Sequence, residues 1–110
     1  MPVLECVDRW GRSIGLHEAR WREHVLDRHA ELSSHLTAVE ATLIDPTVVT
    51  RDRRRDDREN FYRPNLLPPP LDHLYLKVVV EFAQDAPGLG VVITAYPVPQ
   101  VPSKEVTLWP

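Results

Sequence analysis

The sequence predicts a single α+β domain over residues 1–110, with two N-terminal helices packed on an antiparallel β-sheet of three to five strands. Two observations predict this fold. Apolar residues recur at helical spacing in the first half of the chain, whereas the second half contains alternating or β-branched apolar runs. A chain of 110 residues with 43% hydrophobic content suits one core, so a second domain is not expected.

A small hairpin is expected at the start of the chain. Residues 3–7 are strand-like, residues 8–13 form a turn, and residues 14–16 return. Cys6 is the only cysteine, which excludes an intramolecular disulfide and a thiolate metal cage within one chain. We therefore expect Cys6 to be a small, buried strand residue.

Two amphipathic helices should follow the hairpin. The first spans residues 17–32 and has an apolar face formed by Trp21, Val25, Leu26 and Leu32. The second begins with Ser33 or Ser34 as its cap, and its apolar face contains Leu36, Val39, Leu43 and Ile44. It should end at Asp45, because the following Pro46 excludes the preceding residue from the helical region.

The second half of the chain predicts the sheet. Residues 47–50 and 60–63 are strand-like and enclose a charged loop, and residues 66–71 form a stiff, proline-rich connector. Residues 73–82 alternate most clearly, with Leu74, Leu76, Val78, Val80 and Phe82 on the core face. A turn over residues 85–90 leads to a partner strand over 91–96, where strict alternation places Val92, Thr94 and Tyr96 on one face. A last strand is expected at residues 106–109.

The charge of the chain limits its partners. A net charge of −3 argues against binding duplex nucleic acid through a broadly basic surface, but allows a local RNA site. Residues 51–63 contain six arginines and four acidic residues. No segment approaches the ~18 apolar residues that cross a bilayer, and the N-terminus lacks a signal-peptide pattern. We expect a cytoplasmic protein without a membrane partner.

The first helix contains candidate acid–base groups. His24 and Arg28 are neighbours at i and i+4, whereas five residues of regular α-helix would place His29 about 140° from His24. Two imidazoles in that arrangement cannot share one metal ion, so neither a metal nor another cofactor is expected. Imidazoles do suit proton transfer near neutral pH.

RNA cleavage by transesterification requires a base for the 2′-hydroxyl, an acid for the leaving oxygen and a donor to the phosphorane. His24 and His29 are the candidate base and acid, and Arg28 is the candidate donor. The hydroxyls of Thr94 and Tyr96 are candidates for orienting the phosphate. A structural interpretation remains open, in which the histidines and Arg28 are core or solvated helix residues and Tyr96 is an ordinary sheet aromatic.

Three features together resemble a known family. They are the W-x2-H-x3-R-H helix at residues 21–29, the proline-terminated second helix and the late Val-Val-Ile-Thr-Ala-Tyr strand at residues 91–96. This combination resembles the phage-associated branch of the barnase, EndoU, colicin E5/D and RelE-like nucleases. The resemblance implies a metal-free ribonuclease with His24, His29, Thr94 and Tyr96 as catalytic residues. RNA contacts are then expected from Arg28, Tyr62 and Arg63. Ala30 departs from the pattern, because a proline is expected after the second histidine.

A noncatalytic protein-interaction module of the same fold is the alternative. The arginine run of residues 51–63, the prolines of residues 68–70 and exposed aromatics are candidates for contacting another protein. RNA is the expected partner of the enzyme, and an inhibitor or other protein is a further possible partner. The oligomeric state is not predicted.

Overall fold

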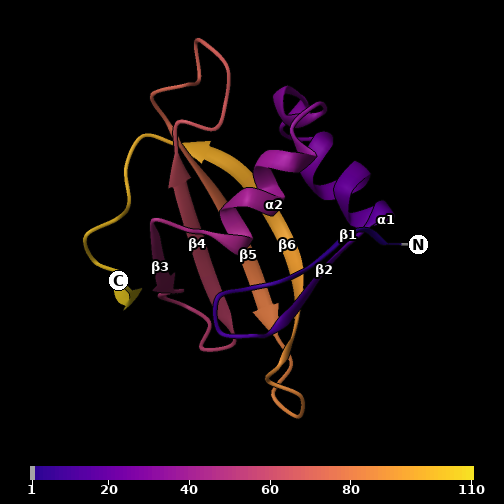
Figure 1. Ribbon diagram of the computed structural model, residues 1–110, viewed down its shortest axis with the longest axis vertical. Helices are drawn as coiled ribbons and strands as arrows, with labels where there is room; N and C mark the ends of the chain where they lie inside the picture. The colour runs from indigo at the N-terminus through magenta and orange to yellow at the C-terminus, as the bar shows by residue number, and fades with distance from the viewer. Residues whose placement is uncertain (1) are drawn as a thin grey trace.

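The computed structural model describes residues 2–110 and contains a seven-stranded mixed sheet (Figure 1). The strand order is β1-β2-β6-β5-β4-β3-β7. The strands are β1 (Pro2–Val7), β2 (Ser13–His17), β3 (Val48–Arg51), β4 (Arg58–Pro64), β5 (Tyr75–Phe82), β6 (Leu89–Val98) and β7 (Val106–Trp109). Neighbouring strands are antiparallel, except that β2 and β6 run parallel.

The predicted architecture of two helices on three to five antiparallel strands is wrong. The N-terminal hairpin forms as expected, but β2 then pairs with β6 and joins the main sheet. Ser13 lies opposite Leu89 in this pairing, and its N–H donates to the carbonyl of Gly88 at 2.8 Å. At the other edge, β7 pairs with β3. Both pairings join segments distant in sequence, so local residue patterns did not reveal them.

The helix predicted over residues 17–32 is interrupted. It consists of a short α1 (Glu18–Arg20), a π-helical η1 (Trp21–Leu26) and a separate 3-10 turn η2 (Ala30–Leu32). The N–H of Asp27 donates to the carbonyl of Arg22, five residues earlier, at 3.1 Å. His29 then has a nonhelical backbone, with φ −136° and ψ 64°. The 140° separation expected for a regular helix therefore does not apply to His24 and His29.

The second helix, α2 (Leu36–Ile44), ends as predicted just before Asp45 and Pro46. Its start differs, because the N–H of Ser33 bonds to the carbonyl of Ala30 in the preceding turn. His35, rather than Ser33 or Ser34, occupies the N-cap position, and its side chain makes no capping bond. Within residues 2–110, no helix has both the length and the apolar character needed to cross a membrane.

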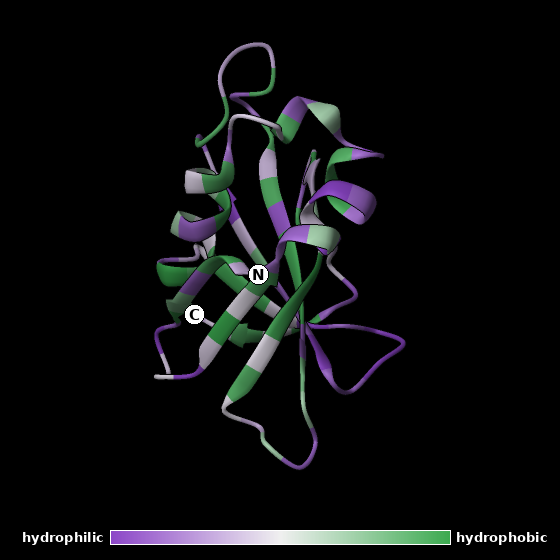
Figure 2. Ribbon diagram, turned by 90° about the vertical axis from the view of Figure 1, so that its right-hand side faces the viewer, coloured by the Kyte–Doolittle hydropathy of each residue, from purple (hydrophilic) through white to green (hydrophobic). Residues whose placement is uncertain are grey.

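The main core lies between one face of the sheet and the helical segments. In Figure 1, α2 lies across the front of β4, β5 and β6. Figure 2 shows apolar residues recurring along strands and helices, while a strongly hydrophilic loop projects to the right in the lower half of the view. Buried core residues include Trp21, Val25, Leu32, Val39, Leu43, Phe61, Val78 and Val80. The opposite side of the sheet is called the outer face below.

An irregularity in β6 determines which side chains reach the outer face. Val80 pairs with Val92, whereas the preceding Val79 pairs with Thr94, so Ile93 is an extra residue in the strand. Val92 consequently faces the core, and the predicted common face for Val92, Thr94 and Tyr96 is wrong. Thr94 and Tyr96 share the outer face with Val79 and with Lys77, the partner of Tyr96.

Candidate functional site

Three adjacent strands bring a lysine between two tyrosines on the outer face. In the sheet register, Lys77 of β5 lies opposite Tyr62 of β4 on one side and Tyr96 of β6 on the other. The Lys77 Nζ atom is 5.8 Å from the ring centroid of Tyr62 and 5.3 Å from that of Tyr96. Both distances suit cation–π attraction, which holds the ammonium close to the two rings.

The helical segment adds an imidazole to this arrangement. The His29 ring stacks on the Tyr96 ring, with a centroid distance of 5.3 Å and an interplanar angle of 20°. His29 Nδ1 lies 3.3 Å from Glu31 Oε1, and the His29 side chain is 30% exposed. Its partial exposure leaves the imidazole accessible to a solute. We call His29, Lys77 and Tyr96 the imidazole patch.

Tyr62 belongs to a buried polar cluster beside the imidazole patch. Its hydroxyl donates to Glu105 Oε1 at 2.7 Å, and the Thr50 hydroxyl donates to the same oxygen at 2.7 Å. Asn60 Nδ2 donates to Thr50 Oγ1 at 3.3 Å, and Asn60, Thr50 and Tyr62 are all fully buried. Burial raises the pKa of Tyr62, and the hydrogen bond to Glu105 raises this pKa further. Tyr62 therefore serves as a neutral hydrogen-bond donor in this cluster.

The raised pKa of Tyr62 predicts a loss of stability at alkaline pH. An unfolded tyrosine releases its proton near pH ~10, whereas folded Tyr62 retains it to higher pH. Its contribution is complete below pH ~10 and declines above it. In urea titrations between about pH 9 and 11, the unfolding free energy of the wild type should fall more steeply than that of Tyr62→Phe, by up to ~1.4 kcal/mol per pH unit. Equal slopes would contradict this role.

Two of the predicted site residues that lie outside the imidazole patch are solvent-exposed. His24 is exposed on η1, and Arg28 is exposed in the turn after it. Within residues 2–110, neither side chain makes a hydrogen bond, ion pair or ring contact. Both remain predictions as site residues.

Arg63, predicted to bind RNA, has structural partners. Its Nη1 atom donates to the backbone carbonyls of Ala41 at 3.4 Å and Asp45 at 3.3 Å, and lies 3.6 Å from Asp45 Oδ2. The guanidinium therefore satisfies carbonyl groups at the C-terminus of α2. A helix-capping role accounts for these contacts without RNA.

The structure brings His29, Tyr96 and Tyr62 into one neighbourhood through Lys77, and Thr94 lies on the same face, two residues before Tyr96. Sequence reasoning missed Lys77 and Glu105. Lys77 did carry a signal, because it is one of only two lysines and stands in an apolar strand. Glu105 carried none, since its contacts depend on where the C-terminal segment lies.

Other parts of the molecule offer less chemistry than the imidazole patch. In the described part of the chain, no group of three or more His, Cys, Asp or Glu side chains is arranged to hold a metal ion. A groove of about 490 Å³ lies where β1, β2 and β6 meet and is bordered by Glu5, Val7, Ser13 and Val91. It lacks an imidazole or a cation. A second groove, of about 460 Å³, is lined by His17 and Arg20, but within residues 2–110 the imidazole patch alone contains an imidazole, an ammonium and a phenol for which ring contacts are observed, and it is therefore taken as the candidate site.

No family model, curated protein or solved structure matches this chain. The case for a function therefore comes from its residues and their geometry.

Proposed function

We propose that the chain is a metal-independent endoribonuclease that cleaves RNA by transesterification at the imidazole patch. The observation that carries the proposal is the contact of the Tyr96 ring with both the His29 imidazole and the Lys77 ammonium. All three residues are partly exposed. A proton acceptor, a fixed positive charge and a phenol are therefore available together to a phosphodiester. The seven-stranded mixed sheet is not the predicted fold, so the proposal depends on this patch and not on the family resemblance.

The proposed reaction assigns a role to each group of the imidazole patch. The His29 imidazole accepts the 2′-hydroxyl proton while the 2′-oxygen attacks phosphorus. The bond between phosphorus and the 5′-oxygen then breaks, and the Tyr96 hydroxyl protonates the leaving oxygen. The His29 imidazolium releases its proton to solvent and the Tyr96 phenolate takes one up from solvent, which restores both groups. Lys77 offsets the negative charge on the phosphorane. The products are a 2′,3′-cyclic phosphate and a 5′-hydroxyl.

Neighbouring groups support this chemistry. Glu31 Oε1 lies 3.3 Å from His29 Nδ1, a contact that orients the imidazole ring. Thr94 shares the outer face with Tyr96 and supplies a hydroxyl for a phosphate oxygen. Arg28 precedes His29 and is exposed, so its guanidinium is free to contact the adjoining phosphate.

A noncatalytic protein-interaction module is the second candidate. The observation that favours it is the exposure of Pro68, Pro69 and Pro70, while Leu67 is buried and anchors this connector. The exposed prolines form a turn, closed by the Leu71 N–H to the Pro68 carbonyl at 2.9 Å, that is available for contact with another protein. This candidate requires no RNA cleavage.

The experiment that tests the enzyme proposal is an RNase assay with EDTA on a broad panel of RNAs. We expect the wild type to cleave, and Thr94→Val to lower turnover by about tenfold or more through loss of a hydrogen bond to a charged oxygen. Thr94→Val keeps the β-branched shape, so its melting temperature should change little. Thr107→Val, an exposed threonine in β7, is the matched control and should retain activity. Absence of cleavage by the wild type would exclude the enzyme and leave the interaction module.

A further inference from the structure

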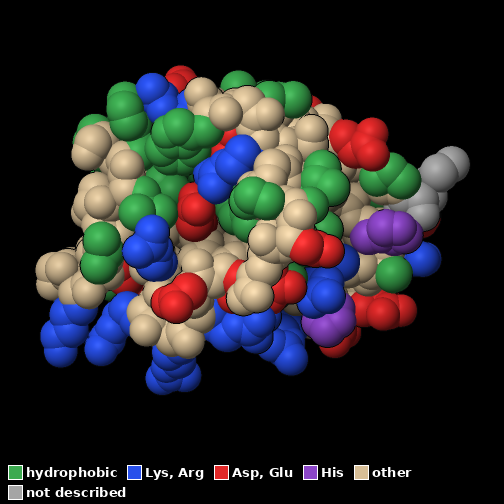
Figure 3. Space-filling model, turned by 90° about the horizontal axis from the view of Figure 1, so that it is seen from below, with side chains coloured by type: hydrophobic (Ala, Val, Ile, Leu, Met, Phe, Trp, Pro, Cys, Tyr) green, Lys and Arg blue, Asp and Glu red, His purple; other side chains and the backbone are tan. Residues whose placement is uncertain are grey.

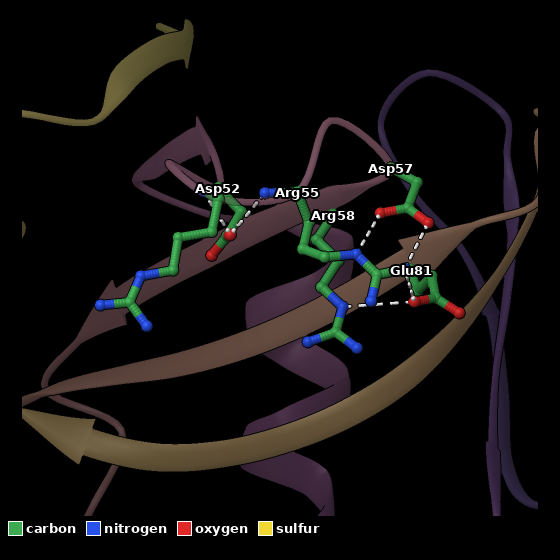
Figure 4. A network of polar contacts seen from close by, with 6 residues as sticks. Asp52, Arg55, Asp57, Arg58 and Glu81 are labelled. Carbon is green, nitrogen blue, oxygen red and sulfur yellow. Dashed lines mark hydrogen bonds and ion pairs between the residues drawn. The ribbon is translucent and has the colours of Figure 1, made fainter.

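In the loop between β3 and β4 and the adjoining strands, two arginines form ion pairs with nearby acidic residues. Arg55 Nη2 lies 2.9 Å from Asp57 Oδ2 and 3.2 Å from Glu81 Oε1 (Figure 4). Arg58 Nε also lies 3.2 Å from the same Glu81 oxygen. Asp52 Oδ2 accepts the backbone N–H groups of residues 54 and 55, both at 3.0 Å. These three carboxylates are thus engaged within the loop and its supporting strands.

A third arginine, Arg12, pairs with the acidic groups near the β1–β2 turn. Arg12 Nε donates to Asp8 Oδ2 at 2.8 Å, and its two terminal nitrogens each donate to Glu59 at 2.8 Å. Its guanidinium lies 3.9 Å from the ring centroid of Phe82 and 4.9 Å from that of Trp10. Arg12 therefore joins the turn to β4 and forms ion pairs with two more carboxylates, although its single charge offsets only one of theirs. It also supports the exposed Trp10.

Among the described residues, four cations without an ion-pair partner are exposed at this end of the molecule. Within residues 2–110, the side chains of Arg51, Arg53, Arg54 and Lys104 make no hydrogen bond or ion pair. Figure 3 views the molecule from this end and shows Lys and Arg side chains along its lower border. Trp10 is 45% exposed. We call Trp10, Arg51, Arg53, Arg54 and Lys104 the cationic end.

Two surface grooves meet at the cationic end and share Arg51. One, of about 350 Å³, is lined by Trp10, Arg12, Arg51, Glu59 and Leu108. The other, of about 310 Å³, is lined by Arg51, Asp52, Arg53, Asp56, Lys104 and Val106. Among the lining carboxylates, Asp52 and Glu59 are already engaged, whereas Asp56 is unpaired. The two grooves together are lined by four cations, Arg12, Arg51, Arg53 and Lys104, and by three carboxylates, so their formal charge is positive, with an exposed indole at one side.

We infer that the cationic end binds single-stranded nucleic acid. Arg51, Arg53 and Lys104 contact successive phosphates, and an unstacked base lies on the Trp10 ring. A single strand fits better than a duplex because stacking on Trp10 requires a free base face, and the net charge of −3 opposes broad duplex binding. The inference goes beyond the proposed function, because binding at this end requires no cleavage at the imidazole patch.

The test is fluorescence anisotropy with a labelled 2′-O-methyl oligouridine of about a dozen nucleotides. This strand lacks the 2′-hydroxyl nucleophile, so it reports binding without cleavage. Arg51→Gln with Arg53→Gln should lower affinity by about tenfold or more, and flatten the plot of log affinity against log salt by ~1.4, or ~0.7 for each phosphate contact. Trp10→Leu should weaken binding by about tenfold through lost stacking.

The matched control is Arg20→Gln with Arg22→Gln. It removes the same charge from α1 and η1, away from the cationic end (Figure 1), and should bind like the wild type. The inference would be overturned if the control lost as much affinity as the Arg51 and Arg53 variant, or if the wild type did not bind the strand. It would also be overturned if the wild type bound duplex RNA or polyglutamate as tightly as the single strand. A chain that binds the strand but never cleaves RNA would refute only the proposed function. Cleavage with binding unaffected by Arg51 and Arg53 would refute only this inference.

Discussion

His29→Ala should lower turnover on RNA by roughly 10²–10⁴-fold, the usual contribution of general acid–base catalysis. The His29 imidazole is partly exposed, lies against Glu31 and stacks on Tyr96, which also contacts Lys77. Replacing the ring removes the proposed acceptor for the 2′-hydroxyl proton while Lys77 remains to attract phosphate. Turnover should therefore fall more than substrate affinity. Steady-state kinetics on a cleavable oligonucleotide would measure the two effects separately.

Two other histidine variants make this result specific. His73→Ala is the matched control, because His73 is exposed in the connector before β5 and has no proposed role. Its turnover should remain at the wild-type level. His24→Ala distinguishes the possible proton donors: full activity agrees with Tyr96 as the acid, whereas a loss of about 10²-fold would assign this role to His24. Full activity in His29→Ala would contradict the proposed mechanism.

Trp21→Ala should lower the free energy of unfolding by ~3–5 kcal/mol, the usual cost of deleting a large buried aromatic side chain. Trp21 is 7% exposed and belongs to the core formed by the helical segments and the sheet. Its removal leaves a cavity beneath the irregular η1 segment, where an interrupted helix has limited capacity to repack. Urea unfolding monitored by far-UV circular dichroism would measure the change.

Trp10→Leu is the control for the Trp21 prediction. Trp10 is 45% exposed, and a surface replacement away from the core usually changes stability by only ~0.5 kcal/mol. A change below about 1 kcal/mol in Trp21→Ala would contradict its assignment to the core. Such a result would also place η1 differently relative to β6 and affect the proposed position of His29.

Local patterns predicted several secondary-structure elements. Pro46 correctly placed the end of α2, and the alternation of Leu76, Val78, Val80 and Phe82 correctly identified the core face of β5. These signals come from backbone sterics and the two-residue period of a strand. The parallel β2–β6 pairing depends on distant segments, so the number of strands and the mixed sheet were not predicted. The extra residue in β6 likewise changed the faces expected from strict alternation.

The candidate site was predicted in part for a similar reason. Residue chemistry identified His29 and Tyr96, which the structure places in contact, but it did not reveal that Lys77 joins them. The angular argument for His24 and His29 assumed a continuous α-helix and failed because the helix becomes π-helical and then stops. Arg63 has the right charge for phosphate, yet its tertiary position caps α2. Side-chain chemistry suggests roles, whereas the fold determines which groups meet.

The central claim is tested most directly by identifying the new RNA ends after cleavage in EDTA. The proposed reaction predicts a 2′,3′-cyclic phosphate on one fragment and a 5′-hydroxyl on the other, detected by mass spectrometry. Under the same conditions, His29→Ala should form these ends at a rate reduced by roughly 10²–10⁴-fold. Metal-independent transesterification at the imidazole patch would be contradicted by a 5′-phosphate product or by loss of cleavage on adding EDTA. An unchanged rate in His29→Ala would contradict it as well.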